Sequence, residues 1–374
     1  MRPKRAALAF AVISLALAAL AWQPVDRHWH AAHLLTSLAN APPASSTEAL
    51  PSSDLVETDL VIPQEGRTLR ARCYRLASAN RGHGLVVAHG VHHKGIDERR
   101  LVPFARALAR EGLVVLTPEL RDLADYRITL SGADDIEASV LYLSQRRDWV
   151  DGPRVGVLGF SFAGGLSLVA ASRPALRDRL AYVASLGGHH DLERVLRFFV
   201  SNEIPTPTGL EKRPAHEYGL VVFVYGNVEA FVPEPDQDTA RNLLREWLKE
   251  DREAARAHAK GCTTAPCHEL LGLLEEGNMQ KLGSRALALI EAHPAQLAAL
   301  SPKGKLATIE APVYLLHGTA DSVIPPGESD WAAQELGPHP HRLLVTPLIE
   351  HVEVSKPAPI TEKLALVRFM AGIM

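Results

Sequence analysis

Short apolar runs rich in β-branched residues alternate with helical patterns along most of this chain. Such alternation is typical of βα units, so we expect an α/β fold with a doubly wound, mostly parallel sheet. Two earlier runs, Leu60 to Ile62 and Leu69 to Tyr74, predict an antiparallel lead-in. The best predicted strands are Gly84 to Ala88, Leu113 to Thr117, Val155 to Gly159, Tyr182 to Leu186, Val313 to His317 and Arg342 to Thr346.

One of the gaps between these strands is far longer than the others. Tyr182 to Leu186 and Val313 to His317 are separated by far more chain than one crossover helix requires. The intervening residues 192–307 have a helical pattern, clearest over Asp236 to Lys260 and Gln280 to Ala292. We therefore expect a helical cap inserted over one end of the sheet. Aromatic residues expected to form its core are Phe198, Phe199, Phe223, Tyr225 and Phe231.

The N-terminus has the layout of an export signal. The basic residues MRPKR precede an uncharged run from Ala6 to Trp22, which is typical of a signal peptide or a signal anchor. Ala19 to Ala21 fits a cleavage site, whereas Trp22 suits an interfacial anchor, so both interpretations stay open. Because the basic cluster stays in the cytoplasm, both predict export to the periplasm or the extracellular space. The second adds a membrane anchor at residues 6–22.

Length and composition favour one large domain with an insertion. The chain has 374 residues, of which 47% are hydrophobic, so it can bury a substantial core. Its formal net charge of -3 gives no field that would attract nucleic acid, and no nucleic-acid partner is expected. The predicted segments are the signal at 1–22, a linker at 23–55, the core at 56–191 and 308–374, and the cap at 192–307.

Three cysteines leave the pairing open. Cys262 and Cys267 enclose Thr-Thr-Ala-Pro, and a local disulfide between them would suit an oxidising compartment. Cys73 would then be the unpaired cysteine. Free thiols are the alternative. No histidine or second cysteine pair stands near Cys262 at zinc-finger spacing, so we expect no metal site there.

A candidate nucleophile follows the predicted strand Val155 to Gly159. The sequence Gly-Phe-Ser-Phe-Ala-Gly places Ser161 between this strand and a helix-like stretch, which is the context of a nucleophile elbow. Small residues at 159 and 163 allow strand and helix to approach closely at a strained turn that exposes the hydroxyl. Ala163 replaces the usual final glycine, so the pattern needs support from elsewhere in the chain.

Candidates for the base and for the carboxylate that orients it follow Ser161 in the chain, which gives the order Ser, Asp, His. A serine needs a base to accept its proton and a carboxylate to orient that base. Asp321 follows the strand Val313 to His317, and His351 follows the strand Arg342 to Thr346. Their joint order and their placement at strand ends predict a catalytic triad of Ser161, Asp321 and His351.

An oxyanion hole is the remaining requirement of acyl transfer. One predicted donor is the N–H of Phe162, at the start of the helix that follows the serine. The other is the N–H of Val91, after His89-Gly90 at the end of the strand Gly84 to Ala88. His89 itself is expected to brace that loop rather than act as a base.

With these residues, the chain resembles the α/β-hydrolase superfamily, particularly its esterase, dienelactone-hydrolase-like and prolyl-oligopeptidase-like branches. The resemblance covers residues 56–374 apart from the cap. It implies hydrolysis through an acyl-enzyme without a cofactor. We expect carboxylic esters of small molecules as substrates, because an apolar cap would form a pocket for an acyl or aryl group. A serine peptidase or amidase and a thioesterase are the alternatives on this fold.

Two other classes remain as hypotheses. One is a binding protein that keeps the fold without the chemistry. The other is a metal enzyme that uses polar residues after strand ends, although their spacing fixes no ligand geometry. These residues are His92, His93, His189, His190 and Asp191. Glu119, Arg121 and Asp122 are expected to form a structural ion network, with Arg121 available to an anionic substrate. The oligomeric state is not predicted.

Overall fold

The computed structural model describes residues 25–38, 54–64, 66–79, 81–350, 353–354 and 359–374. The predicted signal segment 1–22 lies outside these ranges. Within them, none of the helices combines the length and the apolar character needed to span a bilayer.

An eight-stranded sheet forms the centre of the core, with the order β1-β2-β4-β3-β5-β6-β9-β10. β1 and β2 pair antiparallel, as do β2 and β4, and all other neighbours are parallel. This confirms the predicted α/β class with its antiparallel lead-in. The strands are β1 (Leu55–Gln64), β2 (Arg67–Leu76), β3 (Gly84–Ala88), β4 (Val114–Pro118), β5 (Val155–Phe160), β6 (Leu180–Leu186), β9 (Val313–Gly318) and β10 (His341–Thr346).

Alternate residues of the central strands feed two separate hydrophobic clusters. In β3, Val86 and Ala88 pack with α4 and α5, whereas Leu85 and Val87 pack with α2 and α14 on the opposite face. This division follows from the two-residue period of a strand, and it covers both faces of the sheet with helices. The flanking helices include α2 (Leu101–Arg110), α3 (Arg121–Ala124), α4 (Ser131–Gln145), α5 (Phe162–Ala171), α13 (Gly327–Leu336) and α14 (Ile360–Met370).

The predicted linker at 23–55 contains a helix. Residues 25–38 are helical, and Ala31 and Leu34, three positions apart on one face, are fully buried in the cluster that includes α2. The rings of His30 and His33 both bond the Glu111 carboxylate next to the end of α2. The segment predicted as a linker therefore includes a helix, residues 25–38, that packs on the core. Only Ala31 and Leu34 of this helix are buried, so its apolar pattern in the sequence is weak.

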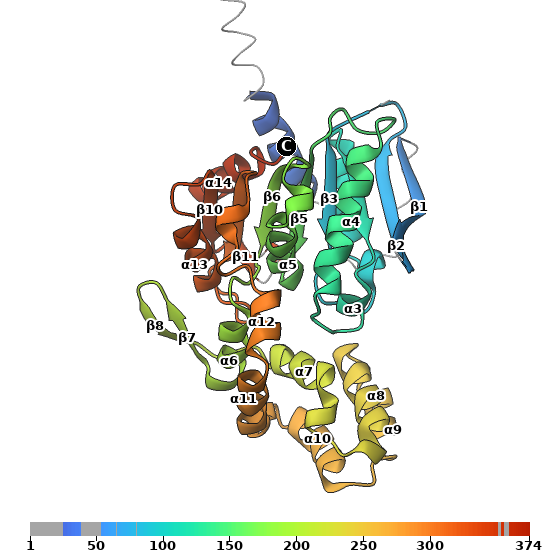
Figure 1. Ribbon diagram of the computed structural model, residues 1–374, viewed down its shortest axis with the longest axis vertical. Helices are drawn as coiled ribbons and strands as arrows, with labels where there is room; N and C mark the ends of the chain where they lie inside the picture. The colour runs from blue at the N-terminus through green and yellow to red at the C-terminus, as the bar shows by residue number, and fades with distance from the viewer. Residues whose placement is uncertain (1–24, 39–53, 65, 80, 351–352, 355–358) are drawn as a thin grey trace, which may run out of the picture.

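The chain between β6 and β9 forms a mainly helical cap. In Figure 1 it lies below the sheet, at the end where β6 leads into α6. The predicted helix Asp236 to Lys260 is two helices, because Glu250 has φ 67° and Asp251 caps the second one. The elements are α6 (Leu192–Ser201), β7 (Glu203–Thr206), β8 (Gly209–Lys212), α7 (Glu217–Gly226), α8 (Gln237–Leu248), α9 (Arg252–Ala259), α10 (Ala265–Glu275), α11 (Gly283–Ala292) and α12 (Pro294–Leu300).

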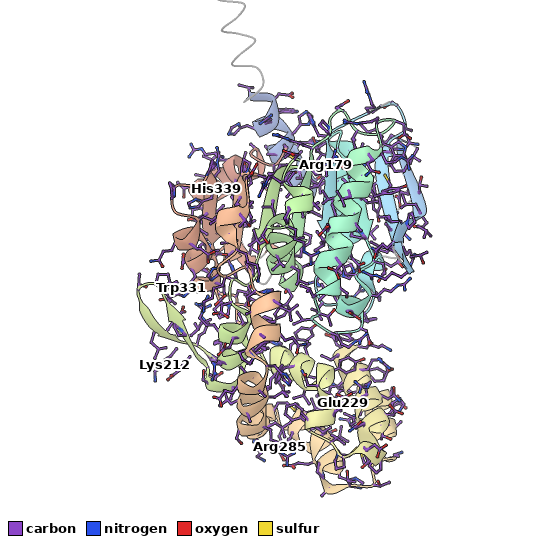
Figure 2. All side chains as sticks on the ribbon, viewed as in Figure 1. Arg179, Lys212, Glu229, Arg285, Trp331 and His339 are labelled. Carbon is purple, nitrogen blue, oxygen red and sulfur yellow. A yellow bond between two sulfur atoms is a disulfide. The ribbon has the colours of Figure 1, made fainter. Side chains whose placement is uncertain are left out.

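The hairpin of β7 and β8 was not predicted. It projects from the cap, with Lys212 on its outer strand, while Glu229 and Arg285 lie on the helical part (Figure 2). The indole N–H of Trp331 on α13 donates to the Pro205 carbonyl at 2.9 Å and ties the hairpin to the core.

The cysteines divide between cap and core. Cys262 and Cys267 form a disulfide at the start of α10. Cys73 is free and buried in β2, where burial raises the pKa of its thiol to about 12.

Candidate active site

Ser161 lies at the turn between β5 and α5, with φ 53° and ψ −131°. This backbone conformation is rare for a residue with a Cβ and costs about 1–3 kcal/mol unless the surroundings hold it. Two hydrogen bonds do so. The Ser161 N–H donates to the Leu186 carbonyl, and the Ser161 carbonyl accepts from the Gly164 N–H, both at 2.8 Å. The serine is thus fixed between strand and helix.

Glycines beside Ser161 allow β5 and α5 to approach closely. A Cβ at Gly159 would lie 2.3 Å from the Ala163 carbonyl oxygen, and a Cβ at Gly164 would lie 2.6 Å from Ser185 Oγ. Both distances are too short for a side chain. Ala163, which replaces the usual final glycine of the pattern, is itself fully buried in the core. The close approach of β5 and α5 therefore depends on Gly159, Gly164 lets α5 approach Ser185 of β6, and position 163 accommodates a methyl group.

The loop after β3 passes beside the serine. β3 is the parallel neighbour of β5, and a Cβ at Gly90 would lie 3.4 Å from Ser161 Cβ. The N–H of Val91 belongs to the peptide that follows Gly90. The N–H of Phe162 lies at the N-terminus of α5, where first-turn N–H groups have no partner within the helix. The chain therefore brings the peptides of both predicted oxyanion donors next to Ser161.

His89 braces this loop through both ring nitrogens. Its Nε2 accepts from the Leu120 N–H at 2.9 Å, so Nδ1 carries the proton and donates to the Gly90 carbonyl at 2.7 Å. Burial lowers the pKa of His89, which keeps the ring neutral near pH 7. With both nitrogens bound to backbone, the ring acts as a fixed support.

Asp321 lies in the loop after β9 and is only 1% exposed. Its Oδ1 accepts from the N–H groups of Val323 at 2.9 Å and Ile324 at 3.0 Å. Its Oδ2 lies 3.5 Å from Nε2 of the buried His317. Because β6 stands between β5 and β9, Ser161 and Asp321 follow the carboxyl ends of strands that are one strand apart.

The predicted base, His351, lies outside the described residues. The short antiparallel strands β11 (Ile349–Glu350) and β12 (Glu353–Val354) flank it in sequence.

No protein-family model matches this sequence, and no curated protein matches it either. Solved structures do resemble it. The rice cell wall degrading esterase LipA from Xanthomonas oryzae has a TM-score of 0.51 and 14% identity, over 84% of this chain and 88% of that chain. An acetyl xylan esterase from a Paenibacillus species has a TM-score of 0.47 and 14% identity, over 93% and 95%.

A Pyrococcus horikoshii acylaminoacyl peptidase has a TM-score of 0.45 and 13% identity, over 80% of this chain. This chain spans 38% of the length of that peptidase. The strand order and the similarity to the LipA esterase decide the fold. This chain has the α/β-hydrolase fold.

In this α/β-hydrolase fold, the cap touches two of the loops that carry predicted site residues. Arg213 Nη1 donates to the Asp321 carbonyl at 2.8 Å, and the Tyr218 hydroxyl donates to the Val91 carbonyl at 2.9 Å. Sequence reasoning missed both residues. Tyr218 and Val91 stand 127 positions apart, and no local pattern marks such a contact.

A cavity of about 190 Å³ lies where the cap meets the α/β-hydrolase core. Its walls come from α6, α7, α11, α12 and the loop before α4, and Ser161 is not among the lining residues. The lining residues are Tyr126, Arg127, Ile128, Thr129, Leu192, Leu196, Phe199, Gly219, Val222, Phe223, Gly226, Asn227, Leu289, Ile290, His293, Gln296, Leu297 and Leu300.

Two side-chain contacts link the cavity wall to the site. The Tyr126 hydroxyl lies 3.0 Å from Nδ1 of His93, in the loop that contains Val91. In the second contact, His189 Nε2 donates to the Leu300 carbonyl at 2.9 Å, and its ring packs against Phe162 with the centroids 5.7 Å apart. One wall residue therefore contacts the loop that contains Val91, and another contacts a histidine that packs on the start of α5.

The histidines of the metal hypothesis have other partners. His190 Nε2 bonds Glu335 at 2.6 Å, and Asp191 caps α6 and pairs with Lys303 at 2.7 Å. The rings of His92 and His93 stack, and burial lowers the pKa of His92 to about 4. In the described ranges, His, Cys, Asp and Glu side chains do not gather in threes as metal ligands.

The predicted ion network after β4 is present in part, because Glu119 pairs with Arg70, which also pairs with Asp97, and Asp122 pairs with Arg127. Glu119 accepts from the Ile96 N–H at 3.2 Å, and Arg121 donates to the Thr68 carbonyl at 2.9 Å. Asp122 accepts from the Ser131 hydroxyl at 2.6 Å at the start of α4. Arg121 therefore supports backbone at the edge of the sheet.

Proposed function

We propose that this protein is a serine hydrolase that cleaves carboxylic esters through an acyl-enzyme. Ser161 Oγ attacks the ester carbonyl carbon and passes its proton to His351, which Asp321 orients. The N–H groups of Val91 and Phe162 stabilise the oxyanion. His351 then protonates the leaving alcohol, and water releases the acid by the same steps.

The strained backbone of Ser161 carries this proposal. Its φ of 53° presents the serine at the end of a buried strand, beside the peptide of Val91 and at a helix N-terminus. A strained residue costs free energy and persists only where the surroundings enforce it. A binding protein gains nothing from such strain at a serine, so this combination favours a catalytic role. The buried carboxylate of Asp321 at a neighbouring strand end supports the same chemistry.

The cavity supports a small, mainly apolar acyl or aryl group. Its 190 Å³ exceeds by little the roughly 150 Å³ of an apolar cavity that holds one benzene molecule. Leu192, Leu196 and Phe199 line one wall. We therefore expect butanoyl, hexanoyl and benzoyl esters to fit, and dodecanoyl esters to be poor substrates.

A fluorophosphonate probe tests the nucleophile. It should label the wild-type protein and leave Ser161→Ala unlabelled. Ser172→Ala is the matched control, because Ser172 ends the same helix and its hydroxyl bonds the Val169 carbonyl. Labelling of Ser161→Ala at the wild-type rate, or an unlabelled wild type, would refute the assignment.

Graded substrates test the bond and the pocket. Hydrolysis of p-nitrophenyl esters with negligible hydrolysis of aminoacyl anilides is expected, and activity on the anilides alone would overturn the ester preference. Gly226 lines the cavity and has open space around it. Gly226→Leu should therefore depress turnover of the hexanoyl ester more than that of the acetyl ester. Gly272→Leu, in equally open space on α10, should leave this ratio unchanged.

We also propose that the protein works outside the cytoplasm. The basic N-terminus followed by the apolar run 6–22 supports export, and the disulfide between Cys262 and Cys267 suits an oxidising compartment. A fusion of residues 1–60 to alkaline phosphatase should be active in a bacterial host, whereas a fusion of residues 23–60 should be inactive.

A further inference from the structure

We propose that one cap segment, residues 213–218, holds the two loops of the active site in place. In this bridging segment, Arg213 is a positioning residue for the loop of Asp321. Tyr218 is a positioning residue for the loop after β3 that contains Val91, which we call the oxyanion loop. The inference rests on the proposed function, since it assigns the segment a role in catalysis at Ser161.

Arg213 grips the loop that contains Asp321. Its Nη1 donates to the Asp321 carbonyl at 2.8 Å and to the Thr319 carbonyl at 3.2 Å, and its Nη2 donates to the same Thr319 carbonyl at 3.2 Å. Glu211 bonds the other side of the guanidinium, which fixes its direction. A planar fork held at both sides restricts a loop more strongly than a single flexible donor would.

The backbone of the segment adds a second tie to the same loop. The His216 N–H donates to the Ser322 carbonyl at 2.8 Å, directly after Asp321. At its base, the segment is pinned by Asn202, which ends α6 with φ 58°: its carbonyl accepts from the Arg213 N–H and its Oδ1 from the Ala215 N–H. The segment is thus a fixed brace.

Tyr218 continues the brace to the other loop. Its hydroxyl donates to the Val91 carbonyl at 2.9 Å, on the peptide that follows the predicted oxyanion donor. Burial raises the pKa of Tyr218, so the hydroxyl keeps its proton and stays a donor near pH 7. Loss of this bond would free the Val91 carbonyl and let the neighbouring N–H turn away from the developing oxyanion.

Small displacements of the Val91 N–H would affect catalysis strongly. A misplacement of about 1 Å can lower turnover by roughly a hundredfold, because oxyanion donors act only when they are aimed in advance. The position of the donor affects the transition state more than the ground state. The effect should therefore fall on kcat and spare KM.

The test compares two tyrosines of the same helix. Tyr218→Phe removes the hydroxyl that bonds Val91. Tyr225→Phe removes the hydroxyl of another cap tyrosine, which donates to Asp125 Oδ1 at 2.7 Å and also joins cap to core. With p-nitrophenyl acetate and butyrate, Tyr218→Phe should lower kcat by about tenfold to a hundredfold with KM nearly unchanged. Tyr225→Phe should retain the wild-type kcat. Both should unfold at similar temperatures.

The possible outcomes separate this inference from the proposed function. A wild-type kcat in Tyr218→Phe, with Ser161 still labelled by a fluorophosphonate, would overturn the positioning role and leave the hydrolase assignment standing. Equal losses of kcat in both variants would also overturn it, because they would indicate general docking of the cap. A wild type without esterase activity or labelling would refute the proposed function itself.

Discussion

In the core, β3 and β5 run through a fully packed layer, and the strand register places Val91 next to Ser161. In the cap, α8 and α9 meet at a turn in which Glu250 has a positive φ, and a disulfide closes the loop between α9 and α10. The core therefore positions backbone through hydrogen-bonded strands, whereas the cap relies on individual side chains. Substitutions at the strand ends of the core should affect chemistry. Cap substitutions away from the bridging segment and the cavity should affect stability.

The largest difference is expected between two buried carboxylates. Asp321→Asn keeps an oxygen for the N–H groups of Val323 and Ile324 but loses the charge that would orient and stabilise a protonated base. If Asp321 acts as proposed, kcat should fall by about 10⁴-fold, as it does when the aspartate of a Ser-His-Asp triad becomes asparagine. Asp236→Asn changes a buried carboxylate of the cap and should leave kcat at pH 7 near the wild-type value. Initial-rate assays with a short-chain p-nitrophenyl ester measure kcat of both variants.

Equal losses in the two variants would contradict the division of roles. Retention of most activity in Asp321→Asn would remove Asp321 from the proposed triad.

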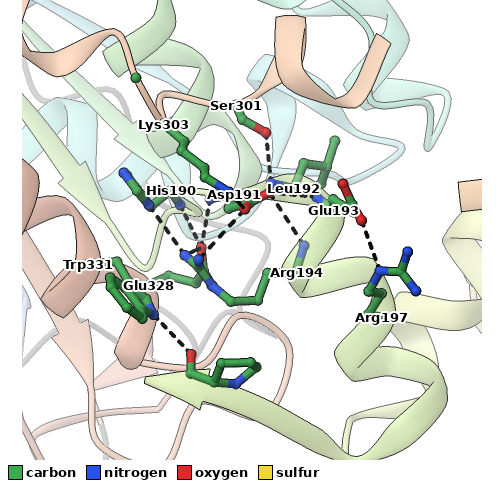
Figure 3. Close-up of polar contacts among 12 residues, drawn as sticks. His190, Asp191, Leu192, Glu193, Arg194, Arg197, Ser301, Lys303, Glu328 and Trp331 are labelled. Carbon is green, nitrogen blue, oxygen red and sulfur yellow. Dashed lines mark hydrogen bonds and ion pairs between the residues drawn. The ribbon is translucent and has the colours of Figure 1, made fainter. Parts of the chain in front are cut away.

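The second prediction concerns the junction between cap and core, shown in Figure 3. Glu328 on α13 is fully buried and accepts from Arg194 of α6, whose Nε lies 2.5 Å from Oε1, and from the N–H groups of His190 and Asp191. Arg194→Met leaves this carboxylate buried without its cation. The free energy of unfolding should fall by about 3–5 kcal/mol, as urea denaturation would measure.

Arg197 is the matched control for this junction. It lies one turn further along α6 and bonds the half-buried Glu193 (Figure 3) and the exposed Glu291. Arg197→Met should cost no more than about 1 kcal/mol, because water screens exposed ion pairs. If both arginine variants lost the same stability, the Glu328 contact would not be the attachment of the cap.

The core was more predictable from the sequence than the cap. β3 is Gly84–Ala88 as predicted, because a buried strand carries its burial in its own residue order. The cap depends on turns. The break at Glu250 and the hairpin of β7 and β8 arise from tertiary contacts such as Trp331 with Pro205, which leave no periodic signal.

The candidate site divides in the same way. The pattern around Ser161 predicted its turn between a strand and a helix, and the predicted strand Gly84 to Ala88 brings its following loop beside Ser161. The contacts of Arg213 and Tyr218 with those loops depend on how the cap folds back over the sheet. Local sequence cannot encode the partner of a side chain more than a hundred residues away, so these residues required the structure.

The third prediction is a smaller effect that depends on pH. Asp236 accepts from the hydroxyl and N–H groups of Thr264 and Thr263, and these bonds, led by the Thr264 hydroxyl, lower its pKa to about 2. Because an ordinary aspartate has a pKa of about 3.9, this contribution to stability is present above pH 4 and is lost as the pH falls towards 2. Wild type should exceed Asp236→Asn in unfolding free energy at pH 6, and this difference should shrink below pH 4. A constant difference across that range would exclude the carboxylate as its source.

The smallest effect separates two glycines with equally open surroundings. Gly272 lies within α10 of the cap and Gly112 follows α2 of the core, and an added Cβ would meet nothing within 4 Å at either position. They differ in backbone conformation, because Gly112 has φ 89°. Gly272→Ala should raise the free energy of unfolding by about 0.5–1 kcal/mol, since alanine loses less conformational freedom in a helix. Gly112→Ala should lower it by about 1–2 kcal/mol, since a Cβ disfavours positive φ. Opposite signs would show that backbone conformation decides whether a glycine with open surroundings can be replaced, whereas stabilisation by both substitutions would contradict this.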